Sequence, residues 1–426
     1  MLARFAIVCT LIRAGKSASQ LKIDADSIII FLSLGKIAEV SDFSEYHGLL
    51  VTKVPALCVE REGGHFMKIE RLQMDDFMLF EQADVTWSKN INVICGSNST
   101  GKTALLKLMY SLLYAYRQSD TKGETKEKIE SRFVEKLTHV FRTEDMQIGR
   151  LARRKQGSSH ASGTLNFSSQ KMLKFGFGNR AVSHMELEYS ENVIKTKAPM
   201  TTVYFPPKEI ISSTENFRSL YEDMHIAFEE PYYDLARLLD RPLKKGKNTD
   251  EQNQVLNSLG NILGGSIVQR ENKFYLKIAG QGEFEMGLVS EGYRKLATIV
   301  YLVLNGSLSA NSVLFWDEPE TNMNPAMIQP LVTAIMQLAK LGVQVFLTTH
   351  DYFLQQYFNM YMAYPESNPD QIEIQFVSLY RDDEEKIMIE KAHTIDELRH
   401  NTIMEEFDRI YDREQGFLYG DTGEPA

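Results

Sequence analysis

The stretch that decides the fold is Gly96-Ser97-Asn98-Ser99-Thr100-Gly101-Lys102-Thr103, which matches the pattern G-x-x-x-x-G-K-[ST] at every fixed position. An apolar run before it, Ile91 to Cys95, predicts a buried strand. The segment after it, Ala104 to Arg117, has leucines and a methionine at helical spacing. A glycine loop between strand and helix cradles phosphate, because its backbone N–H groups and the helix N-terminus attract anions. We therefore predict nucleotide binding, with an incidental glycine turn as the alternative.

Each residue type in this loop has a chemical reason. The glycines let the backbone turn toward phosphate oxygens, Lys102 would neutralise charge on the β- and γ-phosphates, and the Thr103 hydroxyl would bind Mg²⁺. The predicted nucleotide-binding residues of the loop are Gly96, Ser97, Asn98, Ser99, Thr100, Gly101, Lys102 and Thr103.

A second apolar run, Val313 to Trp316, ends in the carboxylate pair Asp317 and Glu318. Residues that follow a buried parallel strand lie at the edge of the sheet where ligands bind. There Asp317 would hold the Mg²⁺ shell together with Thr103, and Glu318 would act as the general base on water attacking the γ-phosphate. The alternative is a solvated acidic turn after a core strand.

Two weaker patterns complete the set. Ser290-Glu291-Gly292-Tyr293-Arg294-Lys295 precedes a helical stripe at Leu296 to Leu304, and Thr348-Thr349-His350-Asp351 follows the apolar run Val343 to Leu347. Taken alone, Ser-x-Gly is common and a histidine at a strand end is more often structural. The four patterns in this order along one chain carry much more weight.

Together the four motifs resemble those of ABC-type ATPases of the SMC-like branch, close to the AAA-domain ATPases grouped with the OLD (overcoming lysogenization defect) proteins. The resemblance runs from Met67 to about Tyr380. It implies an α/β P-loop NTPase of ABC-ATPase head type, with a mainly parallel sheet flanked by helices and a mixed or helical insertion. It also implies ATP and Mg²⁺ as cofactors, Ser290 and Gly292 gripping nucleotide held by another subunit, and a catalytic contact from His350 to the γ-phosphate.

The resemblance assigns further positions less firmly. The segment after the acidic pair implies a D-loop role across a subunit interface for Glu320, Asn322 and Asn324. Pro206-Pro207-Lys208-Glu209 resembles the motif that follows the insertion in this family, but it contains no glutamine. The residue that would supply the lid contact to Mg²⁺ is therefore left unassigned.

The function implied is ATP hydrolysis to ADP and phosphate at sites shared between the heads of a homo-oligomer. A head with a modest insertion resembles the ATPase subunits of anti-phage systems such as Septu and PARIS, which control a separately encoded nuclease or toxin. The main alternative is a DNA-repair ATPase of RecF type. An ABC transporter subunit is less favoured, because the usual Leu-Ser-Gly-Gly-Gln is absent.

Nuclease activity in this chain is not expected. About 45 residues follow Tyr380, whereas the OLD nucleases carry a Toprim domain there. Asp382-Asp383-Glu384-Glu385 is interpreted as an exposed acidic turn rather than a metal cluster, and His393 and His400 as surface residues. DNA contact would need basic groups, and two runs, which are more often solvated loops, offer them. These runs contain Arg150, Arg153, Arg154 and Lys155, and Lys244, Lys245 and Lys247.

Composition excludes several classes of protein. The 426 residues carry 47 Lys and Arg against 57 Asp and Glu, a net charge of −10, which excludes a surface uniformly coated for nucleic acid. Three cysteines are too few for a disulfide scaffold and predict a cytoplasmic protein. No run approaches the roughly 18 apolar residues of a membrane span, so no membrane partner is expected.

The predicted organisation places an N-terminal extension before the ATPase. Glu62-Gly63-Gly64 would be encoded by a purine-rich run like a ribosome-binding site, so translation from Met67 is expected. A genuine small N-terminal element, with a strand at Ile28 to Leu32, is the alternative. The predicted segments are 1–66 (extension), 67–117 (N-terminal lobe), 118–285 (insertion), 286–380 (C-terminal lobe) and 381–426 (helical tail). Within the insertion we predict a loop at Gly149 to Gly163 and a hairpin at Ser266 to Ile278, and within the tail one helix at Thr394 to Asp412 with Phe407 and Ile410 facing inward.

Overall fold

The computed structural model describes residues 67–168, 170–191, 201–224 and 226–419. The chain divides into two units, Met1–Gly64 and His65–Ala426, and all described residues lie in the second. The predictions for 1–66, the start at Met67 and the strand at Ile28 to Leu32, therefore fall outside the described residues. Among the described residues, no helix is long and apolar enough to cross a membrane.

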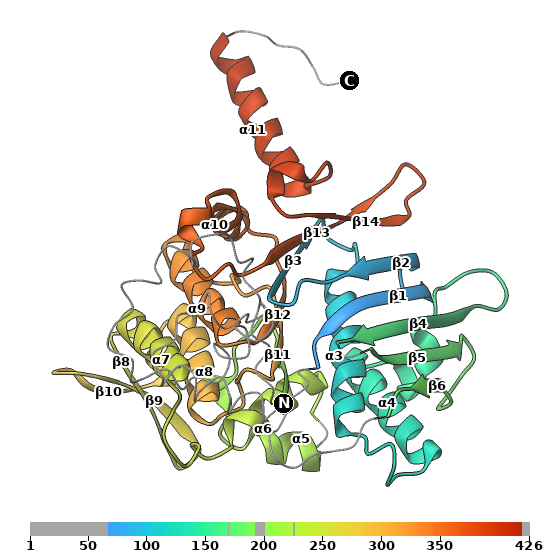
Figure 1. Cartoon of the computed structure of the whole chain (residues 1–426), viewed down its shortest axis with the longest axis horizontal. Coiled ribbons are helices and arrows are strands. Elements are labelled where there is room, and N and C mark those ends of the chain that lie inside the picture. The colour runs from blue at the N-terminus through green and yellow to red at the C-terminus, as the bar shows by residue number, and fades with distance from the viewer. Residues whose placement is uncertain (1–66, 169, 192–200, 225, 420–426) are drawn as a thin grey trace, which may run out of the picture. The chain divides into compact units, whose positions relative to one another are not determined.

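A six-stranded sheet forms the centre of this unit (Figure 1). Five strands are parallel and the edge strand β14 is antiparallel, which confirms the predicted α/β fold with a mainly parallel sheet. In spatial order the strands are β14 (Ile387–Ala392), β13 (Ile374–Arg381), β3 (Ile91–Gly96), β12 (Gln344–Thr348), β11 (Val313–Asp317) and β7 (Thr202–Phe205).

The sheet is buried because its strands are apolar on both faces. Phe315 and Phe346 pack with helix α3 (Lys102–Gln118) on one face. Leu314 and Trp316 point to the other face, which is covered by helices from the C-terminal half of the chain. These helices are α8 (Glu291–Leu304), α9 (Ile328–Lys340) and α10 (Tyr352–Ala363).

A second, antiparallel sheet joins segments from two predicted regions. Its order is β2-β1-β4-β5-β6, and β1 pairs with both β2 and β4. The predicted boundary at residue 117 therefore does not separate two structural units, because strands from 118–285 complete the sheet begun by 67–117. The strands are β1 (Ile69–Phe77), β2 (Phe80–Thr86), β4 (His160–Phe167), β5 (Lys171–Gly178) and β6 (Glu186–Tyr189).

The predicted loop Gly149 to Gly163 is wrong at both ends. A 3-10 helix covers Ile148–Leu151, and β4 begins at His160. Serine and glycine in this stretch suggested a loop, but pairing with β1 and β5 on both sides supplies the hydrogen bonds that make it a strand.

The remaining middle region is largely helical, and its hairpin confirms the one predicted at Ser266 to Ile278. A three-stranded antiparallel sheet, order β10-β9-β8, follows α7. The elements are α4 (Lys126–Phe141), α5 (Phe217–Met224), α6 (Glu230–Leu239), α7 (Asp250–Leu263), β8 (Gly265–Arg270), β9 (Lys273–Ile278) and β10 (Gly282–Glu285).

The predicted helical tail at 381–426 is wrong in part. It begins with β14, and the single helix expected at Thr394 to Asp412 is a 3-10 turn, Ile395–Glu397, followed by α11 (Thr402–Tyr419). Leu398, with extended φ and ψ, breaks the pattern. Phe407 and Ile410, expected to face inward, are 50% and 61% exposed. The predicted exposure is confirmed for Asp383, Glu384, Glu385, His393 and His400, whereas Asp382 is half-buried.

Candidate functional site

The glycine loop connects β3 to α3, as predicted, and two of its glycines are required by geometry. Gly96 has φ +137° and a Cβ there would lie 2.1 Å from the carbonyl oxygen of Leu379. Gly101 has φ +94° and a Cβ would lie 2.7 Å from the ring of Phe80. Both positions combine a left-handed backbone with close packing, so a larger residue would displace the loop.

Lys102 lies folded against its own loop. Its Nζ donates hydrogen bonds to the carbonyl oxygens of Gly96 (2.9 Å) and Ser97 (2.8 Å). Burial lowers the pKa of Lys102 to about 8, although the carboxylate of Glu318 favours the charged form. A desolvated ammonium that is paired only with neutral carbonyls gains much by meeting a phosphate oxygen.

Asp317 ends β11 beside Thr103, the second residue of α3. Its Oδ1 accepts hydrogen bonds from the hydroxyls of Thr103 (3.0 Å) and Thr348 (2.6 Å), and its Oδ2 from the hydroxyl of Tyr204 (3.2 Å). Burial raises the pKa of Asp317, while the two threonine hydroxyls lower it. The carboxylate is thus held from three elements, next to the hydroxyl predicted to share a cation with it.

Glu318 and His350, which follow the ends of the neighbouring strands β11 and β12, face each other. Glu318 Oε1 lies 3.5 Å from His350 Nε2, and both side chains are about one-third exposed, at 34% and 33%. Glu318 has φ +48°, an unusual backbone for glutamate, and its N–H donates to the hydroxyl of Thr348 (3.1 Å). Burial and the nearby Lys102 lower the pKa of His350, so the neutral imidazole is favoured.

Glu320 is not a free surface residue of the loop. Its Oε1 accepts from the Thr349 hydroxyl (2.7 Å) and from the backbone N–H of His350 (2.9 Å). Its Oε2 is buried and has no hydrogen-bond partner in the part of the chain that the structure describes. Burial raises the pKa of Glu320 to about 7. Its side chain therefore fixes the histidine within the same subunit, whereas Asn322 and Asn324 are exposed.

The segment with Ser290 and Gly292 starts α8. Ser290 is the N-cap, is exposed, and makes no side-chain capping bond, while Gly292 is buried in the first turn. Among the described residues, no hydrogen bond or ion pair joins either of them to the glycine loop or the acidic pair. Arg294, in the same helix, forms an ion pair with Glu209 (2.7 Å) from the Pro206–Glu209 segment.

The structure thus gathers Lys102, Thr103, Asp317, Glu318 and His350 at one edge of the sheet and leaves Ser290 outside that group. Sequence reasoning missed two partners of Asp317. The alignment of parallel β11 with β12 places Thr348 beside Asp317. The pairing of β11 with β7 places Tyr204 opposite Phe315, two residues before Asp317. Hydroxyl residues near the ends of neighbouring predicted strands were the available signal.

A cavity of about 460 Å³ opens at the glycine loop and has α11 as one wall. Its lining residues are Gly96, Ser97, Asn98, His350, Thr402, Ile403, Glu405, Glu406 and Arg409. The C-terminal helix therefore borders the region where the sequence predicts nucleotide.

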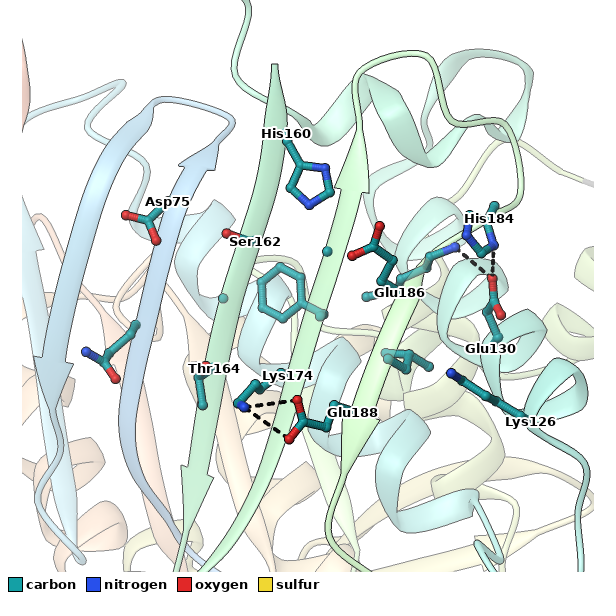
Figure 2. Close-up of a pocket in the computed structure, with 16 residues that line it drawn as sticks. Asp75, Lys126, Glu130, His160, Ser162, Thr164, Lys174, His184, Glu186 and Glu188 are labelled. Carbon is teal, nitrogen blue, oxygen red and sulfur yellow. Dashed lines mark hydrogen bonds and ion pairs between the residues drawn. The ribbon is translucent and has the colours of Figure 1, made fainter. Parts of the chain in front are cut away.

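A second concavity, of about 690 Å³, lies on the antiparallel sheet (Figure 2). Four carboxylates and two lysines line it, and several of these groups are already paired with one another. His184 contacts Glu130 (2.5 Å) and Lys174 contacts Glu188 (2.9 Å). In the described part of the chain, no group of three or more His, Cys, Asp or Glu side chains is arranged to hold a metal ion. This surface does not favour a phosphate backbone, because carboxylates outnumber lysines.

The first basic run is largely neutralised. Arg150 pairs with Glu144 (2.8 Å), Arg153 with Glu81 (3.1 Å), and Lys155 with Asp76 (2.5 Å). Positive charge that is already paired gives a weaker contact for nucleic acid.

Two family models match overlapping parts of the chain. One, described as "AAA domain", covers residues 71–201, and the other, described as "AAA domain, putative AbiEii toxin, Type IV TA system", covers residues 192–354. The first contains the glycine loop, and the second contains the Ser290 segment, the acidic pair and His350.

Among curated proteins, the DNA replication and repair protein RecF of Halalkalibacterium halodurans is 41% identical over 49 residues, which is 12% of this chain and 13% of that protein. Among solved structures, an SMC head bound to the C-winged helix domain of ScpA has a TM-score of 0.45 at 11% identity, covering 76% of this chain and 97% of that one. The SMC head domain of Thermotoga maritima has a TM-score of 0.42 at 11% identity, covering 76% and 99%. The two overlapping family matches, which together contain all four motifs, relate this chain to AAA-domain ATPase families.

Proposed function

We propose that this protein is an ATPase whose reaction centres are each completed by a second copy of the chain. The observation that carries the ATPase activity is the grouping of Lys102, Thr103, Asp317, Glu318 and His350 at one sheet edge. The exposed Ser290 outside this group supports completion by a second copy. Lys102 would leave its loop carbonyls for the β- and γ-phosphates. Glu318, accessible and close to a neutral histidine, would orient and deprotonate the attacking water.

The residues present fit Mg²⁺. A carboxylate and a hydroxyl already within hydrogen-bond distance are hard oxygen donors of the kind this ion prefers. Thr103 and Asp317 would hold it, and the ion would supply charge neutralisation for the phosphates. Thr348 and Tyr204 would keep the Asp317 carboxylate in place through their hydroxyls.

The second half of the site would come from Ser290 and Gly292 of the other copy. Ser290 is exposed, caps a helix without using its side chain, and begins α8, whose N-terminus favours anions. A short Ser-x-Gly turn with these properties suits a γ-phosphate presented by another subunit. The oligomer would thus close on bound ATP and part after hydrolysis.

For the biological role we favour the regulatory ATPase of a defence system that controls a separate nuclease or toxin. The description of the family matched at 192–354 includes a toxin of a toxin–antitoxin system, which is compatible with this role. The short RecF match favours the alternative of a DNA-repair ATPase. The paired state of Arg150, Arg153 and Lys155 argues against strong DNA contact from that run.

Mixing two inactive variants tests the shared site. Lys102→Ala removes the phosphate contact of one half, and Ser290→Arg blocks the other half. Each variant alone should hydrolyse ATP very slowly. If two equivalent copies form two independent sites, an equimolar mixture recovers about a quarter of wild-type activity, since half of the dimers carry one intact site.

Steady-state phosphate release measures this recovery, and one control variant is expected to behave as wild type. Glu384→Gln, in the exposed acidic turn, should behave as wild type alone and in mixtures. Wild-type activity of Ser290→Arg would contradict the shared site, whereas a recovery below a quarter would mean that the intact site also depends on nucleotide at the other site.

A further inference from the structure

Helix α8 contains a buried lysine that the proposed chemistry does not use. Lys295 is 3% exposed, and its Nζ donates hydrogen bonds to the backbone carbonyl oxygens of Pro319 (3.0 Å) and Thr321 (2.7 Å). These two residues flank Glu320 in the loop that follows the acidic pair. One side chain from the Ser290 helix therefore holds the loop of the predicted base.

The same loop contacts both predicted catalytic residues, the side chain of Glu318 and the backbone of His350. The Thr321 hydroxyl donates to Glu318 Oε2 (3.2 Å), and the Thr321 N–H donates to the Glu318 carbonyl oxygen (3.1 Å). Glu320 fixes the backbone of His350 (2.9 Å). A displacement of Pro319 and Thr321 would therefore move the Glu318 carboxylate on one side and His350 on the other.

Apolar packing does not explain a lysine at this position. Burial lowers the pKa of Lys295, and the carboxylate of Glu291 opposes this by favouring the charged form. Burying an ammonium is costly unless it makes strong hydrogen bonds, whereas a methionine would fill similar space without that cost. The two charge-assisted bonds to one loop are the compensating interactions.

We propose that Lys295 is a positioning residue that couples the Ser290 helix to Glu318 and His350. The inference rests on the proposed function and adds its regulation. Ser290 lies five residues before Lys295, about 7.5 Å along one helix, so a shift at Ser290 moves the lysine with it. In a two-fold oligomer, Ser290 would sense nucleotide held by the other copy, while Lys295 adjusts the base of its own copy. Each site would then respond to occupation of the other.

Lys295→Met tests this coupling, since it keeps the length of the stem and removes the donors. We expect the Kd for ATP to stay within about twofold and kcat to fall about tenfold. The wild type should hydrolyse ATP with a Hill coefficient above 1, and the variant with a coefficient of 1. Thr298→Val, which removes a buried hydroxyl one turn further along α8, is the matched control and should keep both values.

A double variant separates positioning from general destabilisation. Adding Lys295→Met to Glu318→Gln should cause no further loss of kcat, because the carboxylate that the lysine positions is already absent. Lys295→Gln, which keeps a shorter donor, should give intermediate kcat and cooperativity, and replaces the methionine variant if that protein does not fold.

Three outcomes would overturn the inference: a wild-type Hill coefficient of 1, a lysine variant that keeps wild-type cooperativity, or losses that multiply in the double variant. Failure of the proposed function has a different result, because Ser290→Arg alone would then hydrolyse ATP at the wild-type rate.

Discussion

The glycine-loop edge and the start of α8 differ in how many of their polar groups are hydrogen-bonded within the subunit. At the edge, Lys102 and Asp317 each make two or more hydrogen bonds within the chain. At the start of α8, Ser290 makes no capping bond and the nearby Leu288 is 75% exposed. The side chains at the glycine-loop edge are thus held by hydrogen bonds within the chain, whereas the start of α8 is exposed on its surface. Variants of the first region should therefore impair a subunit's own site, and variants of the second should impair its partner's.

The largest effect is expected from Lys102→Ala. Removing the ammonium deletes charge-assisted bonds to phosphate, so the affinity for ATP should fall about a hundredfold and hydrolysis should be lost. Equilibrium titration with a fluorescent ATP analogue measures the affinity. Lys107→Ala, one turn and a half further along α3 and paired with Glu229, is the control and should bind as wild type. Equal affinities of the two variants would contradict the assignment of Lys102.

Glu318→Gln should separate binding from chemistry. Loss of a general base typically lowers kcat by about a hundredfold to ten-thousandfold, while binding is retained. ATP should then hold the copies together, so size-exclusion chromatography with ATP should show a larger species than in the wild type. Glu384→Gln is the matched exposed control. An unchanged turnover rate would show that another group activates the water.

The same contrast explains how much of the site the sequence predicts. The glycine loop, Asp317, Glu318 and His350 follow local rules, since each stands at the end of an apolar run that becomes a parallel strand. Tyr204 and Lys295 were not predicted, because their roles depend on strands and helices distant in sequence. The D-loop role expected for Glu320 stays a prediction, but its carboxylate contacts point into its own subunit.

The fold also divides into elements that local sequence predicts and elements that depend on partners distant in sequence. The central sheet was predictable from runs such as Val313 to Trp316, which are apolar on both faces. β14 (IMIEKA) and β5 (KMLKFGFG) neither alternate regularly in polarity nor form a continuous apolar run, and pairing with β13 and β4 defines them as strands. Phe407 and Ile410 follow the helical spacing of a buried face, yet α11 projects beyond the residues that could cover them, apart from the Tyr352 ring stacked on Phe407 (5.0 Å).

Tyr204→Phe should produce a smaller effect inside the organised region. The hydroxyl bond to Asp317 Oδ2 is one of three that hold the carboxylate, so its loss should weaken Mg²⁺ binding about threefold to tenfold. Nucleotide binding titrated against Mg²⁺ gives this shift without relying on turnover. Tyr301→Phe removes a hydroxyl that donates to Arg241 and Gln269 and should leave the Mg²⁺ dependence unchanged. Equal shifts in both variants would indicate a general effect of losing a buried hydroxyl.

Glu320→Gln should give the smallest effect, on stability against pH. Burial raises the pKa of Glu320 to about 7, so folding takes up a proton between the usual glutamate pKa and about pH 7. Stability contributed by the protonated form is fully present below the unfolded pKa and is lost as pH rises through 7. Glutamine keeps the Oε1 acceptor for Thr349 and His350 without a titrating group, so the difference in unfolding free energy between variant and wild type should grow by about 2 kcal/mol from pH 5 to pH 8. Urea unfolding at both pH values measures it, with Glu384→Gln as control. A parallel pH dependence of Glu320→Gln and wild type would mean that the two hydrogen bonds to the carboxylate outweigh its burial, and that Glu320 holds His350 as an anion throughout.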